Sequence, residues 1–192
     1  MKEVVNGIYE TNKMKVEIRE NIVSKTFKKV GNYSKRYTRE KTSLQRLSES
    51  SLFPKLVSFD DKTNNIKMSR IPGSQPESLS ENQIDLLRQM VKSMHDAGVA
   101  RHAIPIRDLL SSNDKELGMV DFERVTLKRF SFSPIWLIAK KVSNYHLCRL
   151  MKEHQSHLLS ESEQIFLEKI NKIRNTLQKI KHIKSKLKSL FS

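Results

Sequence analysis

Two aspartates and the apolar segments between them form the stretch of the sequence that is best suited to chemistry. Asp108 is followed by an apolar pair and a polar tip, after which an apolar run ends at Asp121 and Phe122. This order predicts a short strand hairpin with one carboxylate at each end. Carboxylate oxygens are hard ligands that suit magnesium, and phosphoryl transfer needs a metal held across the phosphates. Asp108 and Asp121 are therefore the candidate metal ligands.

The surrounding segment, residues 94–125, resembles the catalytic core of protein kinases. In those proteins a catalytic loop H-R-D-x-x-x-x-N is followed by a strand pair and a magnesium-binding D-F-G. Residues 118–123 resemble the second motif, with Glu123 in place of the glycine. The details fit best the lipopolysaccharide kinase family of bacteria, the Kdo kinase and WaaP group, in which a charged residue often follows D-F or D-L. The resemblance spans residues 20–170 and is specific only around Asp121.

The catalytic loop can be aligned with this pattern in two registers. In the first, residues 101–103 stand where H-R-D is expected and Asp108 stands at the Asn, so the catalytic Asp is replaced by Ala103. In the second, residues 106–108 are the H-R-D and Asn113 is the Asn, which leaves too few residues for the hairpin. We prefer the first register because it leaves the whole segment up to Asp121 for two strands.

Loss of the catalytic carboxylate limits what such a site could do. General-base assistance is typically worth about 10²–10⁴-fold in rate. A chain with Ala103 at this position would be a slow kinase, unless His102 or Asp108 takes over the role, or a pseudokinase that acts as a binding or regulatory module.

The resemblance also implies an ATP site built from the first half of the chain. Lys25 takes the place of the lysine that holds the α- and β-phosphates, and Glu40 takes the place of the helix glutamate that pairs with it. The hinge whose backbone would meet adenine is formed by Ser69, Arg70 and Ile71. A glycine-rich phosphate loop is missing, because Gly7 stands alone. The alternative is that Lys25 and Glu40 are ordinary solvated side chains and that the hinge is a plain loop.

Hydrophobic periodicity predicts an α+β, protein-kinase-like fold. A small antiparallel-sheet N-lobe would occupy residues 1–71, and a mainly helical C-lobe would occupy residues 72–177, with the catalytic-loop-like segment at 98–123. Strands are predicted at 8–9, 15–19, 22–27, 53–59 and 65–71, and helices at 37–47, 81–97, 134–152 and from 160 onward. Ser80 with Gln83 is a capping box that starts the second helix.

Composition predicts a soluble protein of the cytoplasm. The chain has 192 residues, of which 37% are hydrophobic and 30% charged, as in one globular domain or one small two-lobed unit. No apolar run approaches the length of a membrane span, and residues 1–13 lack the apolar region of an export signal. The lone Cys148 fits a reducing compartment, and we expect a buried, unreactive thiol.

A net charge of +15 points to an anionic partner. The candidates are a nucleotide, an anionic membrane surface or lipopolysaccharide core, and nucleic acid, although the sequence lacks zinc-finger, RNP-like and Walker motifs. Residues 178–192 are predicted to form a basic amphipathic tail that could lie on the inner membrane. The alternatives for this stripe are nucleic-acid binding, a coiled coil, or an ordinary C-lobe helix that packs as far as about Leu177.

Overall fold

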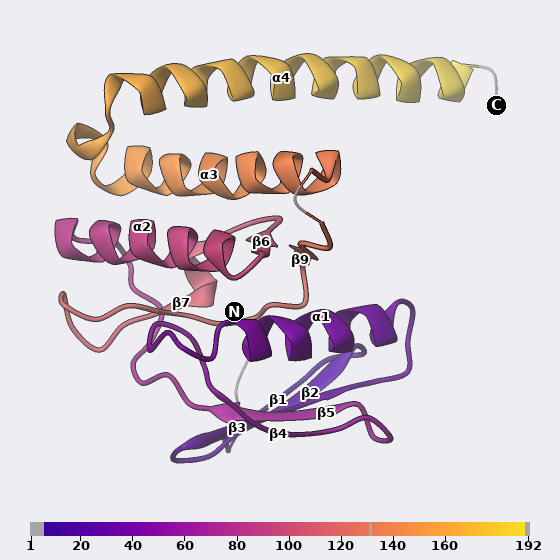
Figure 1. Cartoon of the computed structure of the whole chain (residues 1–192). Coiled ribbons are helices and arrows are strands. Elements are labelled where there is room, and N and C mark those ends of the chain that lie inside the picture. The colour runs from indigo at the N-terminus through magenta and orange to yellow at the C-terminus, as the bar shows by residue number, and fades with distance from the viewer. Residues whose placement is uncertain (1–5, 131, 191–192) are drawn as a thin grey trace.

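A five-stranded antiparallel sheet and three stacked helices make up most of the molecule (Figure 1). The computed structural model describes residues 6–130 and 132–190, except for the side chains of 181–190. The strands of the sheet lie in the order β1-β2-β3-β5-β4. Their bounds are β1 Ile8–Glu10, β2 Met14–Ile18, β3 Ile22–Phe27, β4 Leu56–Asp60 and β5 Asn65–Ser69. These strands lie close to the positions that the sequence predicts.

The helices cover the sheet and then stack away from it. α1 (Tyr33–Arg46) lies on β3, β4 and β5, while α2 (Glu81–Asp96), α3 (Pro134–His154) and α4 (Glu161–Leu190) run side by side with α4 outermost (Figure 1). Short elements lie between α1 and this stack: β6 (Val99–Arg101) pairs with β9 (Val125–Leu127), and β7 (Leu109–Leu110) pairs with β8 (Gly118–Met119). Two 3₁₀ turns, Ile106–Asp108 and Ser156–Leu158, complete the elements.

α2 is the helix that the sequence predicts best. The Ser80 side chain accepts a hydrogen bond from the Gln83 backbone and Gln83 reciprocates, which is the expected capping box. At its other end Gly98 has φ +71°, the left-handed conformation that glycine adopts without strain. The predicted apolar face is fully buried and consists of Ile84, Leu87, Met90, Val91 and Met94.

α1 begins four residues earlier than predicted, at Tyr33 rather than at residue 37. The additional turn is polar, so periodicity gives no reason to expect it. Arg36 in this turn reaches Glu123 across 3.5 Å and lies 5.8 Å from the ring centre of Phe27. Contacts between segments far apart in the sequence thus outweigh local composition.

The buried side of α4 ends earlier than predicted. Leu167 is buried and Ile170 packs against the core, but Ile173 and Leu177 are about half exposed. The core therefore stops about two turns before Leu177. The side chains of 181–190 and residues 191–192 lie outside the described part, so the basic tail at 178–192 stays a prediction. None of the helices within the described residues is long and apolar enough to cross a membrane.

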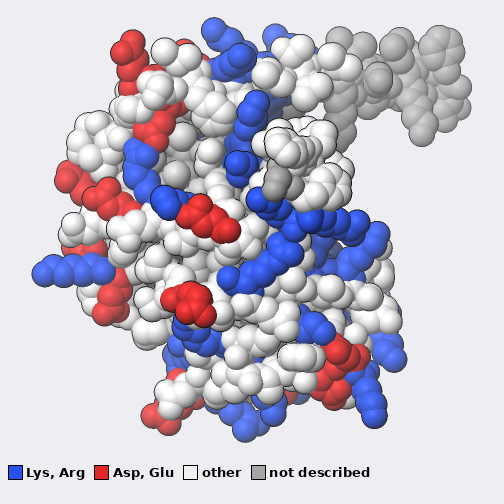
Figure 2. Space-filling view, viewed as in Figure 1, with Lys and Arg blue, Asp and Glu red and all other residues white. Residues whose placement is uncertain are grey.

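Positive charge is unevenly spread over the surface. Figure 2 shows Lys and Arg side chains gathered on one face, beside α1 and the segment that joins β9 to α3. Acidic side chains are more frequent elsewhere on the same view. On the face that Figure 2 shows, the cations are therefore concentrated in one region rather than evenly spread.

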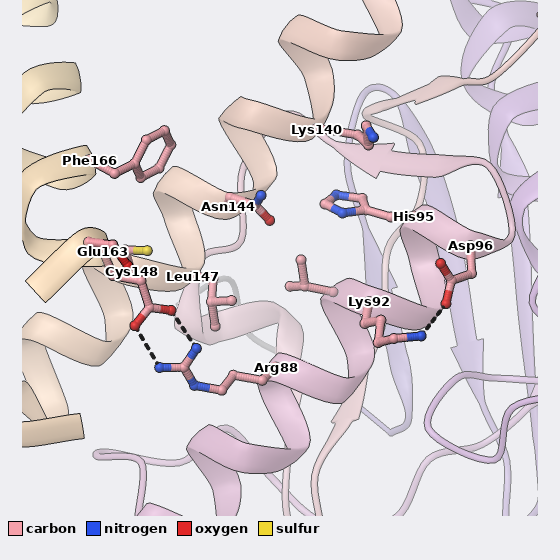
Figure 3. Close-up of a pocket in the computed structure, with 12 residues that line it drawn as sticks. Arg88, Lys92, His95, Asp96, Lys140, Asn144, Leu147, Cys148, Glu163 and Phe166 are labelled. Carbon is pink, nitrogen blue, oxygen red and sulfur yellow. Dashed lines mark hydrogen bonds and ion pairs between the residues drawn. The ribbon is translucent and has the colours of Figure 1, made fainter. Parts of the chain in front are cut away.

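A pocket of about 570 Å³ opens between α2, α3 and α4 (Figure 3). Across it the Arg88 guanidinium binds both carboxylate oxygens of Glu163, with 2.9 Å between Nη2 and Oε2, and Nη2 also donates to the Leu158 carbonyl. Cys148 lies at the pocket wall, and burial raises the pKa of its thiol to about 11. The expected burial of this cysteine is confirmed, and the raised pKa favours the protonated thiol.

The Arg88–Glu163 pair predicts a pH-dependent stability. Hydrogen bonds from Arg88 lower the pKa of Glu163 to about 2. A lowered carboxylate pKa stabilises the folded state above the unfolded pKa, and this contribution disappears as the pH falls from about 4.5 to about 2. Glu163→Gln should therefore cost on the order of 1 kcal/mol at neutral pH and almost nothing at the lower end of that range.

Urea unfolding at several pH values measures this difference. The Gln amide oxygen can still accept from the Ser160 N–H, but the amide NH2 cannot accept from Arg88, so the substitution removes the charge together with one Arg88 hydrogen bond. Glu153→Gln, on the exposed end of α3, is the control and should show no such pH dependence. Equal losses in both variants would contradict the assignment.

Candidate active site

A buried lysine joins three segments of the chain. The Lys25 ammonium, on β3, donates to Glu40 Oε2 on α1 at 3.0 Å and to Asp121 Oδ1 after β8 at 2.7 Å. Lys25 and Glu40 are both buried. The predicted Lys25–Glu40 pair is therefore present, and Asp121 adds a second carboxylate to the same cation.

Strand and helix periodicity explain how these groups meet. Lys25 and Phe27 are the buried positions of β3, alternate with half-buried ones, and point to one face of the sheet. On α1, Glu40 shares the buried stripe of Tyr37 and Leu44, and the Tyr37 ring packs edge-on against Phe27 at 5.9 Å. The buried face of α1 therefore places Glu40 against the sheet, next to the Lys25 ammonium.

The charges of the cluster depend on one another. Burial disfavours the Lys25 ammonium, but the charges of Asp121 and Glu40 outweigh it, so the lysine pKa is raised. Burial raises the pKa of Glu40 despite the opposing charge of Lys25. Burial also acts to raise the pKa of Asp121, but the charge and the hydrogen bond of Lys25 outweigh burial, so the pKa of Asp121 is lowered. The cluster therefore presents a charged ammonium beside a charged Asp121 carboxylate.

Asp121 occupies a special backbone position. Its φ is +68°, in the left-handed region that is costly for residues other than glycine, asparagine and aspartate. This conformation turns the chain at the end of β8, and the next residue, Phe122, is buried edge-on against Phe53 at 5.6 Å. The Phe122 backbone also favours the ionised form of the Glu40 carboxyl, against the effect of burial on its pKa. The anchored phenylalanine fixes the direction of the aspartate side chain.

The predicted hairpin connects Asp108 with Asp121. Leu109 pairs with Met119 and Leu110 with Gly118, and the Val120 N–H donates to the Asp108 carbonyl at 2.9 Å. The hairpin thus begins directly after Asp108, as the first register requires. The second register would begin it only after Asn113, and the observed strands do not allow this.

Asp108 and Asp121 lie close enough to influence each other's ionisation. Burial raises the pKa of Asp108, the charge of Arg101 opposes the rise, and the negative charge of Asp121 adds to it. A divalent cation would relieve this repulsion, and both groups offer the oxygen ligands that magnesium prefers. A magnesium ion held by these two side chains stays a prediction. Among the described residues no group of three or more His, Cys, Asp or Glu could hold a metal.

His102 lies outside this cluster. Its Nε2 hydrogen-bonds to Thr126 Oγ1 at 2.9 Å, and its backbone N–H donates to the Arg124 carbonyl. Partial burial lowers the pKa of His102, and the positive charges of Arg39 and Arg124 lower it further. The structure thus brings Lys25, Glu40, Asp108 and Asp121 together but directs the His102 side chain toward β9.

Comparison with known proteins supports the fold that this geometry indicates. No family model and no curated protein sequence matches the chain. Among solved structures, it is similar to WbdD in a co-crystal with the kinase inhibitor LY294002, with a TM-score of 0.53 and 14% sequence identity. The match covers 76% of this chain and 37% of WbdD. The chain has a kinase-like fold. At this identity the likeness shows the fold alone.

Two parts of this kinase-like fold depart from the usual nucleotide site. The tight turn between β1 and β2 contains no glycine, and Thr11 Oγ1 closes it by accepting from the Lys13 and Met14 backbone. In the predicted hinge, the Ser69 and Arg70 N–H groups donate to the carbonyls of Lys55 and Asn21. Any hydrogen bond from the hinge to adenine would therefore have to come from Ile71 or from carbonyl groups.

Arg101 is the member of the site that sequence analysis missed. Its guanidinium binds the Asp108 carboxylate, donates to the Val120 carbonyl at 2.7 Å and to the Ala103 carbonyl at 3.1 Å, and lies 5.4 Å from the Phe122 ring centre. It is fully buried. The available signal was the position of Arg101 at the end of the apolar strand β6. Arginine is rarely buried without partners, so an arginine there indicates that acceptor groups lie close by.

Proposed function

We propose that the chain is a phosphotransferase that uses ATP and magnesium, with an N-lobe at 1–71 and a C-lobe at 72–177. The observation that carries the proposal is the single buried ammonium of Lys25, held by Glu40 and Asp121. A cation on the non-transferred phosphates and carboxylates for the metal are the parts that phosphoryl transfer requires. The kinase-like fold supports the same conclusion.

Each residue has a defined task in this proposal. Lys25 supplies fixed positive charge for the α- and β-phosphates, and Glu40 keeps its side chain oriented. Asp108 and Asp121 would hold magnesium, and Arg101 orients Asp108. Bound Mg-ATP would supply the phosphoryl group, and the metal ion would neutralise part of the phosphate charge. The two carboxylates are too few to hold the ion alone, so phosphate oxygens would complete its ligands.

The acceptor is proposed from the family resemblance. Lipopolysaccharide kinases act on core sugars, and we propose a lipopolysaccharide-core sugar, phosphorylated at the cytoplasmic face of the inner membrane. The basic residues at 178–192 would then meet anionic lipid.

A pseudokinase is the second candidate, and one observation favours it. Ala103 provides only a methyl group where a catalytic carboxylate is expected, and His102 is bonded to Thr126 instead of approaching the cluster. Asp108 could act as a base only by giving up its role toward the metal. Such a chain would bind nucleotide and act as a binding or regulatory module.

Thermal unfolding with nucleotide, followed by turnover, separates these candidates. At about 100 times Kd, a ligand stabilises the folded state by about 2.7 kcal/mol, which raises the Tm of a domain of this size by roughly 5–10 °C. We expect this rise with Mg-ATP and little with ATP in EDTA. A shift with transfer to lipopolysaccharide core supports the kinase, and a shift without transfer supports the pseudokinase. No shift at saturating Mg-ATP would overturn both.

A further inference from the structure

The segment after β9 exposes an unusual run of large apolar side chains. Phe130 is 63% exposed, Phe132 92%, Ile135 70% and Ile138 62%. Ile135 and Ile138 are one turn apart at the start of α3 and therefore face the same way. We call these four residues the interfacial patch. Single exposed apolar residues are common, but a group of this size within one short segment marks an interaction surface.

Three cations lie next to the interfacial patch and are called the cationic rim. Lys35 and Arg39 on α1 and Arg129 after β9 line a groove of about 590 Å³. Phe130 and Ile135 line the same groove, so these two members of the patch adjoin the rim. This surface lies on the face where Figure 2 shows Lys and Arg side chains gathered.

The cationic rim is not neutralised within the protein. None of its three members forms an ion pair with an acidic group in the part of the chain that the structure describes. The nearby carboxylate of Glu123 is already paired with Arg36. The surface therefore combines uncompensated positive charge with exposed hydrocarbon.

We propose that the interfacial patch and the cationic rim dock on an anionic lipid bilayer. Phenylalanine and isoleucine side chains gain free energy by entering the boundary between headgroups and acyl chains, and lysine and arginine are attracted to anionic headgroups. Nucleic acid would use the cations and could stack on phenylalanine, but it offers nothing that buries the isoleucines. The apolar half of the surface therefore favours lipid.

This surface differs from the basic tail and lies beside the candidate active site. β9 begins four residues after Asp121, and α1, which carries Glu40 of the cluster, also carries Lys35 and Arg39 of the groove. A docked bilayer would therefore bring a membrane-bound acceptor near the cluster, a step that rests on the proposed function. The docking itself requires neither nucleotide binding nor catalysis.

Vesicle co-sedimentation of the full chain tests the docking. The probes are vesicles of phosphatidylcholine alone and of equal parts phosphatidylcholine and phosphatidylglycerol. We expect binding to the anionic vesicles only. Lys35→Gln with Arg129→Gln should weaken it roughly 30-fold, since each cation near the surface contributes about fivefold. Phe130→Ser with Phe132→Ser should weaken it at least as much.

Matched controls keep the test specific. Lys62→Gln changes an exposed lysine in the β4–β5 turn, and Val57→Ser with Ile165→Ser changes exposed apolar residues elsewhere. These should bind as the unaltered chain does, and all variants should keep its melting temperature and its response to Mg-ATP. Because vesicle binding is measured without nucleotide, failure of the docking and failure of the proposed function are distinguishable.

Three results would overturn the docking surface. The first is no binding to anionic vesicles. The second is that deletion of residues 178–192 abolishes binding while the patch and rim variants bind normally, which would assign membrane contact to the tail. The third is that the patch and rim variants lose affinity for a short DNA duplex, measured by fluorescence anisotropy, but not for vesicles.

Discussion

Replacing Asp121 with asparagine is expected to abolish the rise in melting temperature that Mg-ATP produces. The substitution removes a carboxylate that fits magnesium and leaves a neutral amide, which is a weak ligand for a hard cation. Asparagine tolerates the positive φ of this position, so the turn after β8 is retained. Lys25 also keeps Glu40 as a partner, which limits the damage to the fold. Any phosphoryl transfer should disappear together with the thermal shift.

Asp114→Asn is the matched control for this experiment. Asp114 is exposed in the tip of the β7–β8 hairpin and forms no ion pair within the described residues. It should leave the Mg-ATP shift unchanged. Circular dichroism of both variants without nucleotide checks that each is folded. An undiminished shift in folded Asp121→Asn would remove the metal-dependent site from this position.

The arrangement of the site was predictable where it depends on periodicity within one element. The alternation of β3 places Lys25 inward, and the stripe of α1 places Glu40 beside Leu44, so both can be read from spacing. The length of the segment between Asp108 and Asp121 similarly predicts the β7–β8 hairpin. In each case the position of the residue or hairpin is determined by backbone geometry within one helix, one strand or one strand pair.

What the sequence could not supply are contacts between distant segments. Arg101 on β6 donates to the Val120 carbonyl after β8, and Lys25 on β3 donates to Asp121 after β8. The first turn of α1 brings Arg36 to Glu123, and a pocket opens between α3 and α4 where Ile173 and Leu177 become half exposed. Contacts of this kind depend on how helices and strands pack against one another. The hydrophobic pattern of a single sequence constrains that packing only loosely.

Removal of the Lys25 ammonium is expected to destabilise the protein more than removal of either partner. Lys25→Met leaves the buried Glu40 and the neighbouring Asp121 without their shared cation, and an uncompensated buried charge of this kind costs about 3–5 kcal/mol. Glu40→Gln should cost less, because Asp121 still pairs with the lysine. The two substitutions act on one ion-pair network, so the free energies of unfolding should not add.

A double-mutant cycle with Lys25→Met and Glu40→Gln measures this coupling by urea unfolding, and the same four proteins can be compared for nucleotide affinity. We expect a coupling free energy of about 1–3 kcal/mol, because loss of the carboxylate charge removes much of the penalty that loss of the ammonium creates. The exposed pair Lys92–Asp96, 2.7 Å apart on α2, is the control and should couple by less than about 0.5 kcal/mol. Additive losses for Lys25 and Glu40 would mean that the two charges are solvated independently. A fixed ammonium that is oriented by its helix carboxylate, as the proposed phosphate contact requires, would then be absent.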